Sequence, residues 1–147
     1  MTAPIVVRGE AAQACIDRFA GRAMAWGKVD CVQIAAHNLR HLGIATSLMK
    51  GASYASEMGA AKALRARGFS GLGDAMDAVG QPFRIPPAMA TTGDIIGLVS
   101  EGSLWDMALV VSVGNGRVLG IKEGICGVMQ PDMERAITAW RCNPWRR

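Results

Sequence analysis

The sequence predicts an α+β domain in which N-terminal helices pack on a C-terminal antiparallel sheet. Three observations indicate this fold class. Apolar residues recur at helical spacing through the first half of the chain. Three prolines, Pro82, Pro86 and Pro87, then interrupt the helical pattern. Short apolar runs follow, separated by turn signals such as Asn115-Gly116, and this arrangement is typical of antiparallel strands packed under helices.

The bulk composition fits one globular domain over residues 1–147. The chain has 147 residues, of which 50% are hydrophobic and 19% are charged. No apolar run approaches the ~20 residues that cross a bilayer, so we expect no membrane span. The first eight residues lack the basic region and apolar stretch of a signal peptide, and we therefore expect folding in a cytoplasm. Residues 143–147 form a short polar tail whose Trp145 we expect to dock on a neighbouring protein.

The helical half divides at its glycines and capping residues. Four helices are expected, over residues 10–23, 31–42, 53–68 and 72–79. Asp30 is placed to cap the second helix, and Gly43 is placed to stop it. In the third helix, Glu57 lies next to the position it would occupy in a capping box that begins at Ser53.

The second half divides at its turn residues. Five strands are expected, over residues 95–99, 107–113, 117–121, 125–129 and 137–142. The run 107–113 is continuously apolar, which predicts a central strand covered on both faces. Asn115-Gly116 predicts a type I′ hairpin, and Lys122-Glu123-Gly124 predicts a three-residue hairpin loop with glycine in the left-handed position. Residues 131–135 are expected to form a short helical turn.

The net charge of +4 does not indicate a nucleic-acid interface. Much of the excess lies at the end of the chain, in Arg141, Arg146 and Arg147. The other basic residues are scattered, and only 5% of the residues are aromatic, whereas nucleic-acid surfaces cluster both. We expect no specific nucleic-acid partner, and an acidic protein partner stays open.

The four cysteines do not follow a metal-binding pattern. Cys15, Cys31, Cys126 and Cys142 form no C-x-x-C unit, and the second half of the chain has no histidine. We therefore expect no metal and no cofactor. A disulfide framework is not expected in a cytoplasmic chain, so most of these cysteines should be small buried apolar residues.

Cys31 is the candidate catalytic nucleophile. A thiol in the first turn of a helix lies near unpaired backbone N–H groups and the positive end of the helix dipole, which favour the thiolate and lower its pKa. The same amides could stabilise an oxyanion during acyl transfer. The alternative is that Cys31 is a buried residue on a helix face, which is the more common situation for cysteine.

A cysteine nucleophile also needs a base, and the two histidines of the chain are badly placed for this role. His37 follows Cys31 by six residues, which in a helix is roughly 120° away in direction and ~9 Å along the axis. His41 lies ~15 Å along the same axis. We expect both histidines on an outer or flanking face of the helix.

The segment Trp26-Gly27-Lys28-Val29-Asp30-Cys31 resembles the start of the catalytic helix in the NlpC-like papain-fold cell-wall peptidases. The order of later elements extends the resemblance from about residue 19 to residue 140 and is similar to that of a small group of phage and prophage proteins. These elements are Tyr54 with Ala61, Leu64 and Gly68, the segment Ile85 to Pro87, Gly93-Asp94, and Ala139 to Arg141.

The resemblance implies a papain-like fold with Cys31 at the nucleophile position. It places the partner histidine at Asp106, Met107 or Ala108, none of which is histidine. Asn115 and Glu123 are candidates for the third polar residue of the triad, but turn positions account for both. A carboxylate at Asp106 would disfavour a nearby thiolate, so it does not replace the base.

The resemblance also implies a place among the proteins of a phage tail tip or hub. The leading hypothesis is a structural virion component on a degenerate NlpC-like fold, made in the host cytoplasm and bound to other tail proteins. A second hypothesis is an active cysteine peptidase or amidase that cleaves peptidoglycan peptides during DNA entry. A third is a host-interaction protein on the same scaffold.

Overall fold

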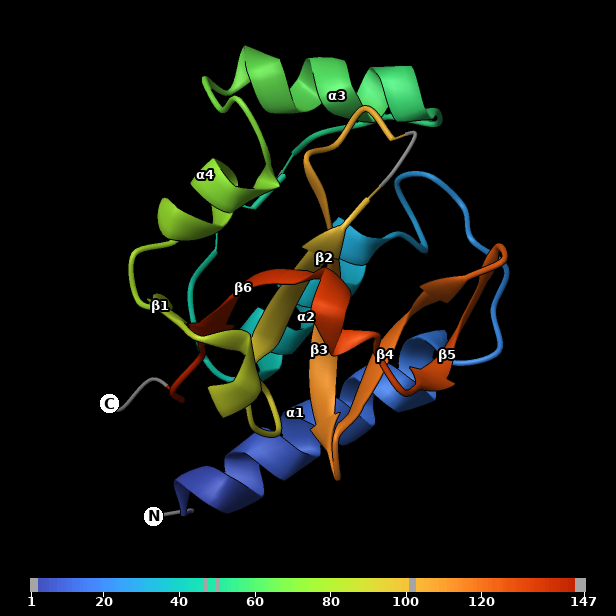
Figure 1. Cartoon of the computed structure of the whole chain (residues 1–147). Helices are drawn as coiled ribbons and strands as arrows, with labels where there is room; N and C mark the ends of the chain where they lie inside the picture. Colours follow the sequence, from blue (N-terminus) through green and yellow to red (C-terminus); the bar gives the residue numbers. More distant parts are fainter. Residues whose placement is uncertain (1–2, 47, 50, 101–102, 145–147) are drawn as a thin grey trace.

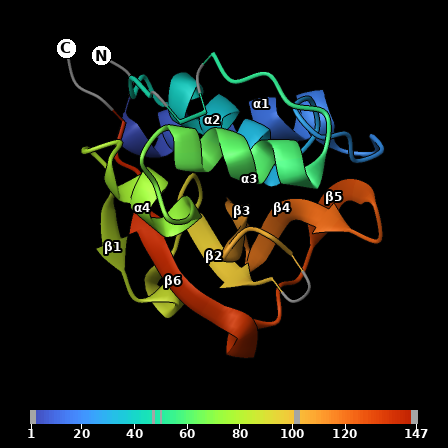
Figure 2. The ribbon, with the colours of Figure 1, turned by 90° about the horizontal axis from the view of Figure 1, so that it is seen from above.

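A six-stranded antiparallel sheet forms one layer of the fold, and helices cover one of its faces (Figures 1 and 2). The structure is a computed structural model that describes residues 3–46, 48–49, 51–100 and 103–144. The predicted α+β class, with N-terminal helices on a C-terminal sheet, is confirmed. The helices are α1 (Pro4–Phe19), α2 (Cys31–His41), α3 (Glu57–Ala66) and α4 (Leu72–Asp77). The strands are β1 (Phe83–Ile85), β2 (Ile95–Val99), β3 (Met107–Gly114), β4 (Arg117–Lys122), β5 (Ile125–Met129) and β6 (Ala136–Arg141).

The strand order is β1-β6-β2-β3-β4-β5. Strands β2 to β5 form the expected meander, and β6 returns to pair with β2. The edge strand β1 was not predicted, because three residues beside prolines carry no strand pattern. It forms by pairing with β6, where Arg84 lies opposite Trp140. Two single-turn helices, η1 (Pro87–Met89) and η2 (Met133–Arg135), complete the described elements, and η2 matches the expected turn at 131–135.

The first helix was predicted too late in the chain. It begins at Pro4, since proline at the first helical position loses no hydrogen bond and already has helical φ. It ends at Phe19. The segment that follows the helix runs beside β5, where the Cys126 N–H donates to the Arg22 carbonyl at 2.9 Å and Ala23 pairs with Ile125.

The third helix starts later than predicted. Ser56 is the N-cap, and its hydroxyl accepts a hydrogen bond from the Gly59 N–H at 3.0 Å. The Glu57 carboxylate accepts the Leu104 N–H at 2.7 Å instead of closing a capping box. Because α3 begins at Glu57, Tyr54 lies in the loop before the helix and not within it.

The hairpin turns follow from residues with positive φ. Asn115 and Gly116 both have positive φ, as a type I′ turn requires. The second hairpin differs from the prediction, because Lys122 pairs with Ile125 in the ladder. Only Glu123 and Gly124 form that turn, both with positive φ, so it has two residues and not three.

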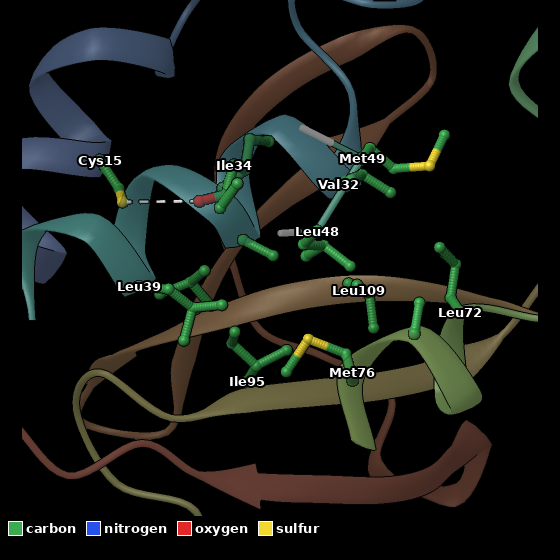
Figure 3. Close-up of a cluster of buried hydrophobic side chains, with 14 of the residues drawn as sticks. Cys15, Val32, Ile34, Leu39, Leu48, Met49, Leu72, Met76, Ile95 and Leu109 are labelled. Carbon is green, nitrogen blue, oxygen red and sulfur yellow. Dashed lines mark hydrogen bonds between the residues drawn. The ribbon is translucent and has the colours of Figure 1, made fainter. Parts of the chain in front are cut away.

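The main core lies between the helices and the sheet (Figure 3). In Figure 3, Leu39 extends from α2 towards the sheet layer that carries Leu109 and Ile95, whereas Ile34 lies on the side of α2 that is near Cys15 of α1. The opposite sheet face carries a smaller cluster, formed by Ile96, Val110, Val118 and Ala139. Strand β3 is therefore central and buried on both faces, as predicted. In the described part of the chain, none of the helices is long and apolar enough to span a membrane.

Candidate functional site

The second helix begins as predicted, with Asp30 at the N-cap and Cys31 as its first residue. The Asp30 Oδ1 accepts a hydrogen bond from the Gln33 N–H at 2.9 Å, which satisfies one of the unpaired amides at the helix start. The Asp30 side chain is completely buried. A buried carboxylate needs several donors, and the surrounding loop supplies them.

The loop before the helix folds back on Asp30. The Gly27 N–H donates to Asp30 Oδ2 at 2.8 Å. Gly27 has φ of 83° and leaves no room for a side chain, because a Cβ there would lie 2.3 Å from the Tyr54 carbonyl oxygen. The spacing from Gly27 to Cys31 is thus explained by backbone geometry around a buried carboxylate.

Tyr54 completes this cluster and was not assigned a role in it from the sequence. It is the only tyrosine of the chain. Its hydroxyl donates to Asp30 Oδ2 at 2.9 Å and accepts from the Gln33 Nε2 at 3.3 Å. Burial raises the pKa of Tyr54, and the adjacent Asp30 carboxylate acts in the same direction. No periodic signal could have revealed this contact, because Tyr54 lies in a loop 24 residues from Asp30.

The Cys31 thiol has a raised pKa, whereas the helix position alone predicted a lowered one. Desolvation raises the pKa of Cys31 to about 12, and the Asp30 carboxylate adds to this effect. Hydrogen bonding from the backbone of Leu109, Cys31 and Val32 acts in the opposite direction but is weaker. The thiol therefore lies between the start of α2 and the middle of β3, and it stays protonated at neutral pH.

The two histidines lie on the flank of α2 that contacts α1, in agreement with the prediction. The His37 ring packs edge-on against Phe19 at 5.4 Å between centroids, and His41 lies 4.5 Å from His37. Burial lowers the pKa of His37 to about 4, and His41 and Arg40 act in the same direction. The groups acting on the Cys31 thiol include neither histidine.

The start of β3 shows what replaces the expected strand histidine. Met107 is buried in the main core and shares a sheet face with Leu109. Ala108 is directed to the opposite face, where it pairs with Leu98. Asp106 turns away to α4, and its carboxylate accepts the Leu72 N–H at 2.6 Å.

Asp106 therefore caps a helix. A Cβ at Gly71 would lie 2.5 Å from the Asp106 carboxylate, so glycine at the α4 N-cap makes room for this contact. Asn115 and Glu123, the candidates for a third polar residue, occupy hairpin turns with positive φ. Among the residues that the structure describes, neither histidine is thus brought to the Cys31 thiol.

Trp26 and Trp105 pack against each other beside the loop that precedes α2. Trp26, directly before Gly27, contacts Trp105 at 5.1 Å between ring centroids in a T-shaped arrangement. Trp105 is 5% exposed, and its Nε1 finds no hydrogen-bond acceptor in the described residues. Trp140 is fully buried and donates to Asp77 Oδ1 at 2.9 Å. Trp145 lies outside the described residues.

The other cysteines are buried, as expected. Cys15, Cys126 and Cys142 are at most 1% exposed, and all four thiols are free. Burial raises the pKa of Cys15 and Cys142 to about 12 and that of Cys126 to about 11. Within the described ranges, no group of three His, Cys, Asp or Glu side chains could hold a metal ion.

Comparison with known proteins gives one family. No curated protein and no solved structure matches the chain. A family model described as a domain of unknown function, DUF6950, matches residues 8–142. This range includes every element from the body of α1 to the end of β6. The chain therefore belongs to the DUF6950 family.

Proposed function

We propose that the protein is a non-catalytic structural component of a phage tail tip or hub, built on a papain-like scaffold that has lost its chemistry. The observation that carries the proposal is the environment of Cys31. The thiol belongs to the first residue of a helix that packs on β3, and this strand carries Met107 and Leu109 in the core but no histidine. A thiol with a pKa of about 12 and no imidazole is a poor nucleophile.

The contacts around the helix start support a structural role for the same residues. Asp30 accepts hydrogen bonds from Gly27, Gln33 and Tyr54, so its carboxylate is fully used in joining three segments. The Asp106 carboxylate likewise accepts the Leu72 N–H at the start of α4. Both carboxylates near the candidate site are therefore bound to backbone N–H groups. The location in a tail rests on the order of motifs in the sequence that resembles the phage and prophage group.

Two experiments test the two parts of the proposal. For the chemistry, the protein and its Cys31→Ala variant are incubated with peptidoglycan peptides, and products are separated by mass spectrometry. Equal, background-level cleavage by both is the expected result. Cleavage that Cys31→Ala abolishes would establish the alternative, an active cysteine peptidase or amidase.

For the location, particles purified from an induced culture of the strain that carries the gene are analysed by quantitative mass spectrometry. The protein should co-purify with tail proteins at a fixed stoichiometry. Its absence from particles that contain the other tail proteins would reject the structural role. Recovery with a host protein, and not with particles, would favour the host-interaction hypothesis.

A further inference from the structure

The two histidines of the chain form a pair on one flank of α2. His37 and His41 are four residues apart, so they lie one above the other on the helix surface. Their ring centroids are 4.5 Å apart. Two imidazoles that occupy adjacent positions on one metal ion, at metal–nitrogen distances of about 2.0 to 2.1 Å, have centroids about 4.5 to 5 Å apart. The pair therefore has the spacing of two ligands of a single metal ion.

The ring of His37 is held in place by α1. It packs edge-on against Phe19, and hydrogen bonding to the Ala14 backbone acts on the same ring. A histidine that gives one ring N–H to a backbone carbonyl keeps its other nitrogen free of a proton, which is the usual arrangement of a metal-binding imidazole. The His37 ring is thus positioned by its surroundings before any ion binds.

The charges around the pair restrict which ions it can bind. Burial, His41, Arg40 and Arg18 lower the pKa of His37, so this ligand is neutral at pH 7, as metal binding requires. The same guanidinium groups disfavour cations that bind mainly by electrostatic attraction. Mg²⁺ and Ca²⁺ are such ions and prefer oxygen ligands, whereas copper, nickel and zinc form strong bonds to imidazole nitrogen.

The site is open to solvent. His41 is exposed and His37 is partly exposed. Within the described ranges, no third histidine, cysteine or carboxylate joins them in a group of metal ligands, so water occupies the remaining coordination positions. The zinc-protease motif H-E-x-x-H has the same histidine spacing and uses its glutamate as the general base. Here that position holds Asn38, which is buried and donates to the Gly93 carbonyl at 2.9 Å. The arrangement therefore favours binding and not hydrolysis.

We propose that His37 and His41 form a two-histidine binding site for a late first-row transition-metal ion, with Cu²⁺ bound most strongly. The two imidazoles occupy adjacent positions on the ion. Affinity for such ligands rises from nickel to copper and falls again at zinc. The proposal does not depend on the tail function, because neither histidine belongs to the Asp30–Tyr54 cluster or acts on the Cys31 thiol.

Titration of the ¹⁵N-labelled, tag-free protein with CuCl₂ locates the site by NMR. The paramagnetic ion should broaden the amide signals of residues 37–41 first, together with those of Ala14 and Phe19 on α1. NiCl₂, which does not oxidise thiols, should broaden the same signals with weaker affinity. MgCl₂ at the same concentrations should leave these signals unchanged.

The variant His41→Gln tests whether the two rings bind one ion. It removes an exposed side chain, so the fold should be retained. Because a second ligand on the same scaffold strengthens binding through its effective concentration, His41→Gln should weaken Cu²⁺ binding about a hundredfold. Competition with glycine measures the affinity, and circular dichroism without metal verifies the fold.

Two charge variants form a matched pair. Arg40→Gln removes an exposed cation beside the site and should strengthen Cu²⁺ binding about two- to fivefold, the size of an exposed charge interaction. Lys28→Gln makes the same charge change at an exposed position before the start of α2, at least about 15 Å away along the helix axis. It should leave the affinity unchanged.

Three outcomes would overturn the proposal. Equal Cu²⁺ affinities of the unmodified protein and His41→Gln would show that the pair does not bind one ion together. Broadening centred on the first residues of the chain or on a cysteine would assign the copper to the terminal amine or to a thiol. Equal effects of Arg40→Gln and Lys28→Gln would show a response to net charge and not to a site on α2.

Discussion

The Tyr54 hydroxyl donates a 2.9 Å hydrogen bond to the buried carboxylate of Asp30, the residue that caps α2. This bond joins the loop before α3 to the start of the helix that carries Cys31. The same carboxylate holds Gly27 through its N–H. Asp30 therefore organises three segments around the thiol, and its loss should affect the whole domain.

Asp30→Ala should lower the free energy of unfolding by about 2 to 4 kcal/mol. The change removes an N-cap and leaves the Gly27 N–H and the Tyr54 hydroxyl without their acceptor. Tyr54→Phe deletes only the hydroxyl and should cost about 1 kcal/mol. Asp17→Ala, in an exposed pair with Gln13, is the matched control and should stay within about 0.5 kcal/mol. Urea unfolding measures all three, and equal effects of Asp30→Ala and Asp17→Ala would contradict the capping role.

Cys31 should react slowly with thiol reagents in the native protein at pH 7. A rise in pKa from 9.0 to about 12 reduces the thiolate population on the order of a thousandfold. Iodoacetamide labelling followed by peptide mass spectrometry measures the rate at each cysteine. The rate at Cys31 should be far below that in urea-unfolded protein and should rise steadily from pH 7 to pH 10. Rapid native labelling at pH 6 would indicate an activated thiol and would argue against the structural interpretation.

Local sequence signals were sufficient for most of the fold. Asp30 at an N-cap, Gly43 after a helix and Asn115-Gly116 in a hairpin each act through their own backbone, so their effects could be predicted. The edge strand β1 could not, since it exists only by pairing with β6. The early start of α1 was signalled by Pro4 at the first helical position, which the apolar periodicity alone did not reveal.

The candidate site was only partly predictable for the same reason. The position of Cys31 at a helix start follows from local capping, but the pKa of its thiol is raised by burial in the folded chain, while the backbone of Leu109, more than 70 residues away, acts against this rise. Likewise Asp106 was considered only in relation to the thiol, whereas its partner is the α4 N-terminus. Tertiary contacts decide the electrostatics of a buried group, and sequence spacing does not contain them.

Asp94 should be among the most sensitive positions for stability. Its carboxylate is completely buried, accepts the Cys142 N–H at 2.9 Å, and forms ion pairs of 3.0 Å with Arg8 of α1 and Arg141 of β6. Asp94→Ala should cost about 3 to 5 kcal/mol, because it leaves two cations of low exposure without their partner. The comparison is Arg84→Gln, which breaks a pair with Asp77 that is about half exposed and should cost about 1 kcal/mol. Equal denaturant midpoints for Asp94→Ala and Arg84→Gln would contradict the larger contribution of Asp94 to stability.

His37 should make the protein less stable as the pH falls from about 6.5 to 4. Packing against Phe19 and the nearby His41 and Arg40 hold its folded pKa near 4, below its usual 6.5. In that interval the unfolded chain binds a proton that the folded chain does not, so the free energy of unfolding decreases with falling pH. The contribution is about 1 to 2 kcal/mol after allowance for solvent screening of a half-buried ring. Urea unfolding of the protein and of His37→Leu, followed from pH 7.5 to pH 4, isolates it as the difference between the two curves. A constant difference across this range would show that His37 titrates alike in both states, and the packing of its ring on α1 would then have no electrostatic consequence.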